Sequence, residues 1–196
     1  MTTYAQAARE LLRSTLLDAA RGQLDERPWQ QVTMAQVAAA AGVSRQTLYN
    51  EFGSREALAQ ALVLREEDRF LAAVEAAVAS TGHDDVAAAL AAAFDVFLIA
   101  AREDPLVSAV LSVSGNEELL ALLLTQGGPV LERAVDRLVA VVTSGWPGVS
   151  PHAAAVLAEI LVRLAISLAA QPAGPAGLDA ATVAEVLRPY AERLLG

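Results

Sequence analysis

The chain has 196 residues, a formal net charge of −9, 55% hydrophobic residues and no cysteine. This length allows a sizeable core or two small domains. The lack of cysteine excludes a disulfide framework and thiol chemistry. Residues 4–24 carry apolar side chains at helical spacing and are predicted to form the first helix, ending between Asp25 and Pro28. Trp29 follows this helix and is expected to lie in the core.

Residues 33–52 have the pattern of two short helices joined by a tight turn, the helix-turn-helix arrangement of DNA-binding proteins. Thr33 can cap the first helix, and Gln36 completes a capping box. Gly42 suits a turn with a left-handed backbone, and Ser44 can cap the second helix. Two ordinary amphipathic helices are the alternative. The helix caps, the glycine turn and the separation of apolar and polar faces on the second helix agree over twenty residues, however, and favour the motif.

The second helix of the motif has an apolar face and a polar face. Leu48 and Phe52 are four residues apart and point into a core. On the outward face, arginine can bind guanine O6 and N7, whereas glutamine or asparagine can bind adenine N6 and N7. Threonine and tyrosine suit phosphates or a thymine methyl group. The side chains expected to face DNA are Arg45, Gln46, Thr47, Tyr49 and Asn50.

The rest of the chain is also predicted to be helical, with no strand pattern. A long helix is expected over 54–80, after the cap Ser54. The later helices are predicted over 84–102, 104–115, 116–127, 129–144, 151–170 and 179–195. The fold class is therefore all-α with about nine helices. A helix-turn-helix domain over 1–53 precedes a larger helical domain over 54–196, and the 54–80 helix connects the two.

The motif resembles the tetracycline-repressor family of bacterial transcription regulators over roughly the first 65 residues. The resemblance implies phosphate contacts at Thr33, Ser44, Tyr49 and Arg55. It places Arg45, Gln46 and Asn50 on or near bases. The segment 45–54 also resembles a branch from high-GC bacteria, some members of which regulate alkane-oxidation genes. The residues that carry the family resemblance are Thr33, Val37, Ala38, Gly42, Val43, Ser44, Thr47, Leu48, Tyr49, Phe52 and the segment 54–58.

Two positions depart from the family pattern. Position 55 is usually lysine, and Arg55 keeps the positive charge. Position 51 is often histidine beside the DNA backbone, whereas Glu51 would repel phosphate, so no DNA contact is expected there. The net charge is +1 over residues 1–55 and −10 over the remainder. An acidic body can discourage nonspecific DNA contact, although a solvated acidic surface that aids solubility is the better explanation.

The helices at 151–170 and 179–195 are predicted to form a dimer interface. A helix that is apolar most of the way round must be buried on more than one side, so one side can face a second subunit. In the family these positions form a four-helix bundle across a twofold axis. A fully internal helix is the alternative. The predicted interface stripe is Val156, Ile160, Leu164 and Ser167.

The resemblance also implies a ligand pocket among the middle helices. Ligand sites are mostly apolar with a few polar groups, so we expect a small hydrophobic effector, although the same residues would also suit an ordinary core. The apolar candidates are Phe94, Phe97, Leu98, Val107, Leu111, Leu122, Leu123, Leu131, Val135 and Trp146. The polar candidates are Arg102, Asn116, Gln126 and Arg163.

These features predict a repressor that binds a palindromic DNA operator as a homodimer and is released by a small apolar ligand. The alternatives are a helical interaction module or a constitutive, ligand-independent repressor. An enzyme finds little support, because phosphate-loop, nucleophile-elbow and paired-histidine motifs are absent from the sequence. The acids beside His83 are explained by a helix start, so no metal or cofactor is expected.

We expect the protein to be cytoplasmic and not bound to membranes. Arg9, Glu10 and Arg13 interrupt any apolar run near the amino terminus, so no signal peptide is expected. The longest uncharged stretch, 138–158, is broken by glycines and prolines and is not a membrane span.

Overall fold

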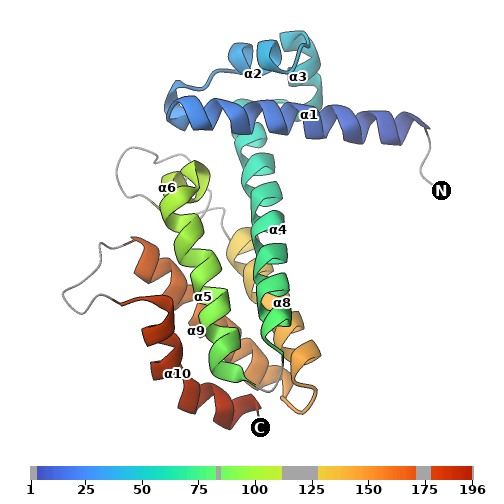
Figure 1. The fold of residues 1–196 in the computed structure, drawn as a ribbon. Coiled ribbons are helices and arrows are strands. Elements are labelled where there is room, and N and C mark those ends of the chain that lie inside the picture. The colour runs from blue at the N-terminus through green and yellow to red at the C-terminus, as the bar shows by residue number, and fades with distance from the viewer. Residues whose placement is uncertain (1–3, 83–84, 112–127, 171–177, 196) are drawn as a thin grey trace.

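The computed structural model describes residues 4–82, 85–111, 128–170 and 178–195. In this part of the chain the regular structure is helical, without a strand, as the sequence predicts. Figure 1 shows the N-terminal helices forming a head at one end of the molecule. One long helix leaves the head and enters a body in which the remaining helices pack together (Figure 1).

The head consists of α1 (Tyr4–Glu26), α2 (Met34–Ala40) and α3 (Arg45–Phe52). A short 3-10 turn, Trp29–Gln31, joins α1 to α2, and the Trp29 side chain is 1% exposed. Trp29 therefore lies in the core, as predicted. The first helix ends at Glu26, within the predicted region between Asp25 and Pro28.

The long helix α4 (Arg55–Thr81) links the head to the body. The Ser54 hydroxyl caps it by accepting a hydrogen bond of 3.1 Å from the Ala57 amide. Ser54 is therefore the N-cap, as predicted, and a single uninterrupted helix carries the chain from the helix-turn-helix motif into the body.

The body contains five further helices in the described residues. The predicted helix over 116–127 lies outside these residues. Aspartates cap two of the later helices: the Asp85 side chain accepts from the Ala88 amide, and the Asp179 side chain accepts from the Thr182 amide. The five helices are α5 (Val86–Glu103), α6 (Pro105–Leu111), α8 (Gly128–Gly145), α9 (Pro151–Ala170) and α10 (Ala180–Leu195).

By length and composition alone, α9 could cross a membrane. In the structure it packs against α8 and α5 within the body, and its residues Ala154, Leu157 and Ala158 are buried there. The apolar composition of α9 is therefore explained in part by packing inside the body.

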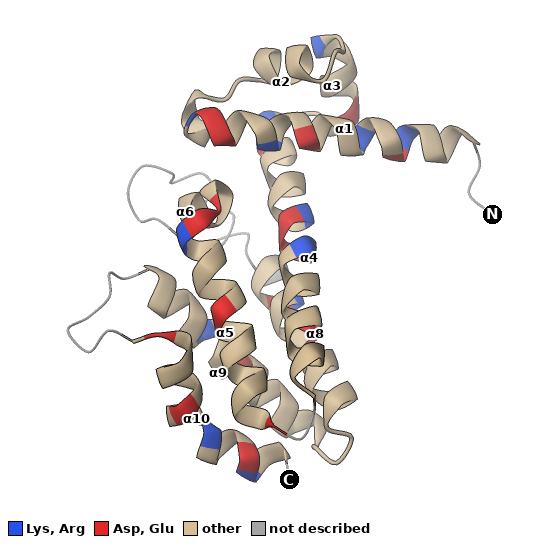
Figure 2. Cartoon of the chain, in the orientation of Figure 1, with Lys and Arg blue, Asp and Glu red and all other residues tan. Residues whose placement is uncertain are grey.

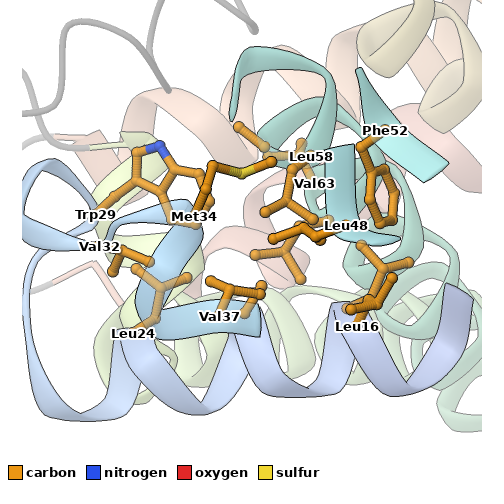
Figure 3. Packing of buried hydrophobic residues seen from close by; sticks show 14 of the residues in the cluster. Leu16, Leu24, Trp29, Val32, Met34, Val37, Leu48, Phe52, Leu58 and Val63 are labelled. Atoms are coloured by element: carbon orange, nitrogen blue, oxygen red, sulfur yellow. The ribbon is translucent and has the colours of Figure 1, made fainter. Parts of the chain in front are cut away.

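The head core is shared with the body. Side chains from α1, α2, α3 and the first turns of α4 meet in one cluster (Figure 3), which includes Leu16, Val37 and Leu48, each 0% exposed. Leu106 and Val110 of α6 belong to the same cluster. The head is thus held against the body by buried apolar contact as well as by the α4 connection.

Candidate DNA-binding surface and internal cavity

The first helix of the motif begins at a complete capping box. The Thr33 amide donates to the Gln36 side-chain oxygen at 2.8 Å, and the Gln36 amide donates to the Thr33 hydroxyl at 3.3 Å. The turn after α2 passes through Gly42, whose φ of 69° lies in the left-handed region that glycine adopts most cheaply. Both local predictions are confirmed, and together they fix how α2 leads into α3.

The next helix, α3, is capped by Ser44, whose hydroxyl accepts from the Thr47 amide at 3.0 Å. Leu48 and Phe52 point into the shared core and are 0% and 8% exposed. This anchoring fixes the rotation of α3 about its axis. Its polar side is therefore held outward on the head.

The outward side of α3 carries the predicted DNA-facing residues. Arg45, Gln46, Tyr49 and Asn50 are exposed, and Thr47 is half-buried. The Gln46 side-chain amide donates to the Asn50 side-chain oxygen at 2.8 Å, so the two amides lie together on one face. The structure brings these side chains to one surface, and their contacts with DNA stay predictions.

Glu51 faces α1 rather than open solvent. Its carboxylate accepts hydrogen bonds from Arg9 Nε at 3.0 Å and Arg13 Nη1 at 3.1 Å, and its side chain is 7% exposed. Burial raises the pKa of Glu51, but these two arginines outweigh it and hold the pKa below its usual range. The sequence gives no sign of this pairing across about forty residues. It means that the negative charge of α3 is neutralised within the head.

Arg55 also has partners inside the head. Its Nε donates to the Val32 carbonyl at 3.1 Å and one Nη donates to the Trp29 carbonyl at 2.6 Å. The guanidinium lies 4.9 Å from the centre of the Trp29 ring, within the range of a cation–π contact. A cation in the first turn of a helix opposes the helix dipole, and these contacts explain its presence there. The predicted phosphate contact of Arg55 stays a prediction.

Replacing Arg55 with alanine should lower the free energy of unfolding by about 2–3 kcal/mol, because two carbonyls of the Trp29–Val32 segment lose a charged donor. Chemical denaturation measures this change. Arg45→Ala, which removes an exposed arginine from α3, is the control and should leave stability unchanged. If Arg55 also binds a phosphate, its variant lowers the salt dependence of DNA binding by roughly one contact. Unaltered stability would contradict the structural role.

The body contains a cavity of about 190 Å³ between α4, α5, α6, α8 and α9. This volume is far above the ~10–15 Å³ that one water molecule needs. Its wall is almost entirely apolar and includes the predicted residues Phe94, Phe97, Val107 and Leu131. The apolar wall has the character of a small-molecule site.

Several predicted pocket residues do not line this cavity. Leu98 packs in a cluster of α5, α9 and α10, and Trp146 packs against α10 and the α8–α9 connection. Arg102 donates to the Leu98 carbonyl at 3.2 Å, and Arg163 pairs with Glu159 on the surface of α9. The structure thus places these four side chains away from the wall of this cavity. Val135 is likewise absent from the cavity wall. The side chains of Leu111, Asn116, Leu122, Leu123 and Gln126 lie outside the described residues.

Two acidic residues of α4, Glu66 and Glu67, line the cavity and were missed at the sequence level. They belong to the run Arg65–Glu66–Glu67–Asp68, which has the composition of a solvated helix face. Figure 2 shows the mixed charges along α4. Burial raises the pKa of Glu67 to about 7, against the opposing effect of Arg133. The only sequence signal for Glu67 was its place four residues before the apolar Leu71.

The predicted interface stripe lies on an outer face of α9. Ile160 is 39% exposed, Ser167 is exposed, and Val156 and Leu164 are half-buried. On α10, Val186 is 72% exposed. Large apolar side chains on two helices are thus left uncovered in a single subunit. A face of this kind is typical of an interaction surface.

Family models match most of the chain. The model of bacterial regulatory proteins of the tetR family matches residues 16–62, and that of the bacterial tetracyclin repressor C-terminal domain matches residues 85–189. The first covers α2 and α3 with the capped turn between them. The second covers most of the body.

Individual relatives agree along the whole chain. The transcriptional regulator AlkX of Mycobacterium tuberculosis is 40% identical over 191 residues, which span 97% of this chain and 90% of the relative. The crystal structure of AlkX from a Dietzia strain, a repressor implicated in biodegradation of n-alkanes, has a TM-score of 0.77 at 34% identity and covers 93% of this chain and 98% of its own. A regulator from Pectobacterium atrosepticum has a TM-score of 0.69 at 20% identity, with 97% of both chains covered, and shows the shared fold.

Proposed function

Because the chain belongs to the tetracycline-repressor family of bacterial transcriptional regulators, we propose that it represses transcription by binding a palindromic operator as a homodimer. We further propose that a small apolar ligand in the body cavity releases it from DNA. The family consists of DNA-binding regulators and not of enzymes, and this chain is such a regulator. Its place of action is then the cytoplasm, where the DNA is.

The observation that carries the DNA-binding proposal is the geometry of α3. Two buried side chains anchor the helix, and its opposite side presents Arg45, Gln46 and Asn50 to solvent. A helix held in this way can enter the major groove, where these side chain types read base edges. One helix of eight residues reads few base pairs, so a second copy related by a twofold axis supports tight and selective binding.

The ligand proposal is supported by the cavity and by the helix that borders it. The same helix α4 begins at Arg55 beside the motif and carries Glu67, Phe70 and Val74 on the cavity wall. A ligand that tilts α4 would change the separation of the two recognition helices, which must be roughly 34–36 Å for adjacent half-sites. A coupling of ~1–3 kcal/mol between the sites is typical of such regulators. The alkane link of the Dietzia relative also favours an apolar ligand.

A gel-shift assay with the DNA upstream of the protein's own gene tests the proposal. We expect a retarded complex that forms selectively over unrelated DNA of equal length. Adding apolar compounds should dissociate the complex and raise the melting temperature, whereas polar compounds should do neither. Selective binding that no compound releases would favour a constitutive repressor. Absence of selective binding at all would favour a helical interaction module.

Replacing Gln46 with alanine should weaken binding to the operator by ~1–3 kcal/mol and relax the base preference at one position of each half-site. The variant loses an exposed amide that the structure holds beside Asn50. Binding titrations with a set of single-base operator variants measure both effects. Gln30→Ala, at an exposed glutamine outside the motif, should change neither. An unchanged base preference in the Gln46 variant would remove this residue from the readout.

A further inference from the structure

The carboxyl group of Glu67 is buried in the cavity wall. Its side chain is 7% exposed, and neither carboxyl oxygen accepts a hydrogen bond from the residues that the structure describes. Arg133 Nε of α8 forms an ion pair with one of these oxygens at 3.4 Å. Burying a polar group without a hydrogen-bond partner costs free energy. A ligand that brings a hydrogen-bonding group to this carboxyl would remove that cost.

The neighbouring Glu66 lies on the same wall but, unlike Glu67, has hydrogen-bond partners. It also lines the cavity, but its carboxylate accepts hydrogen bonds from Arg65 at 3.0 and 2.8 Å and from Arg69 at 3.1 Å. Two arginines of its own helix therefore satisfy Glu66. Of these two acids, Glu67 alone is left to meet a ligand.

The charges around Glu67 restrict the ligand's polar group. Arg133 lies close to Glu67 and also binds Asp68 at 2.5 Å. A cationic group beside Glu67 would meet the Arg133 guanidinium, and a carboxylate would meet the Glu67 charge. A hydroxyl both donates and accepts, so it can pair with Glu67 whether that group is ionised or protonated. A neutral hydroxyl also loses less solvation on burial than an ion does.

The rest of the cavity suits an apolar chain. Side chains from α4, α5 and α9 form its walls, and they include Phe70, Val74, Phe94, Phe97 and Ile166. The Phe70 and Phe97 rings meet edge to face, with centroids 5.6 Å apart. These walls offer no further charge beyond Glu66 and Glu67 among the lining residues described. Among the described residues, Glu67 is therefore the unsatisfied polar group that the wall offers to the polar end of a ligand.

We propose that the cavity binds an apolar chain that ends in a hydroxyl, a primary alcohol, and that the Glu67 carboxyl binds this hydroxyl. The inference rests on the proposed function, in which the cavity is the effector site. It specifies the chemical class of the effector and the residue that selects it. Glu67 acts here in ligand binding, with Arg133 and Asp68 setting the charge around it.

Calorimetric titration of the full-length protein with four eight-carbon probes tests the inference. The probes are 1-octanol, octane, octylamine and octanoate. We expect 1-octanol to bind about tenfold more tightly than octane, the factor that one hydrogen bond to a charged group provides. Glu67→Leu should bring the two affinities within about twofold. Glu67→Gln keeps an acceptor and a donor and should retain a preference for the alcohol. Glu159→Gln is the matched control and should leave the preference unchanged, because Glu159 is exposed on α9 and pairs with Arg163 away from the cavity wall.

The possible negative results of this titration separate the role of Glu67 from the proposed ligand response. Equal affinities of the wild-type protein for 1-octanol and octane would overturn the role of Glu67 and leave the apolar effector site intact. Tightest binding of octylamine or octanoate would overturn the choice of a neutral group. If none of the four probes binds and none releases the protein from operator DNA, the proposed ligand response itself is wrong.

Discussion

Replacing Ile160 with arginine should yield a folded monomer that has lost tight binding to a palindromic operator. Ile160 is 39% exposed on the outer face of α9. At a twofold interface each substitution appears twice, so two arginines would be brought together in an apolar contact. Without the dimer, the two recognition helices no longer bind as one unit. The affinity for the whole operator should then fall by about 10²–10⁴-fold, the usual gain from linking two sites.

Analytical ultracentrifugation and gel-shift titration measure the two effects together. Ile99→Arg is the matched control, because Ile99 is also an exposed isoleucine of the body, 45% exposed on α5. That variant should remain dimeric and bind DNA as the wild-type protein does. A wild-type protein that sediments as a monomer at micromolar concentration would rule out the arrangement.

Glu67→Gln should stabilise the protein above pH 7 and have little effect near pH 4.5. Burial raises the pKa of Glu67 from an ordinary 4.5 to about 7 in the folded protein, and Asp68 adds to the rise while Arg133 opposes it. Between these two values the folded state keeps a proton that the unfolded state has lost. Stability of the wild-type protein therefore falls as pH rises through this window and levels off above it. The full difference corresponds to about 3 kcal/mol.

Urea denaturation of both proteins between pH 4.5 and 8 measures this prediction. Glu75→Gln is a control with the opposite sign. Its carboxylate accepts from Arg137 Nη2 at 2.9 Å, which holds the pKa of Glu75 below its usual range. Removing that charge should lower stability at neutral pH. A difference between wild-type and Glu67→Gln that stays constant over the whole range would show that Glu67 does not titrate in this window.

The DNA-reading motif could be predicted from the sequence because its signals are local. The Thr33–Gln36 box, the Gly42 turn and the Ser44 cap each act over three or four residues. The helix caps Asp85 and Asp179, farther along the chain, also act over three residues. The helices and their order were thus open to prediction without any knowledge of tertiary contacts.

The partners of the charged residues could not be predicted in this way. Glu51 is neutralised by Arg9 and Arg13, which lie about forty residues earlier in the chain. Arg163 was expected in the pocket and lies on the surface, whereas Glu67 lies on the cavity wall. Both lie on helices with apolar residues on several sides. Periodicity places a residue on a face of its helix, and only the packing of helices decides what that face meets.

The shared core has a consequence for how the molecule unfolds. A fragment that ended at Gly53 would lose Leu58 and Leu62 of α4 and Leu106 of α6, all within the cluster that buries α3. We therefore expect that α3 does not fold stably in such a fragment. Head and body should open to solvent in one cooperative event. A compound held in the cavity would then slow hydrogen exchange at the amides of α2 and α3 without touching either helix.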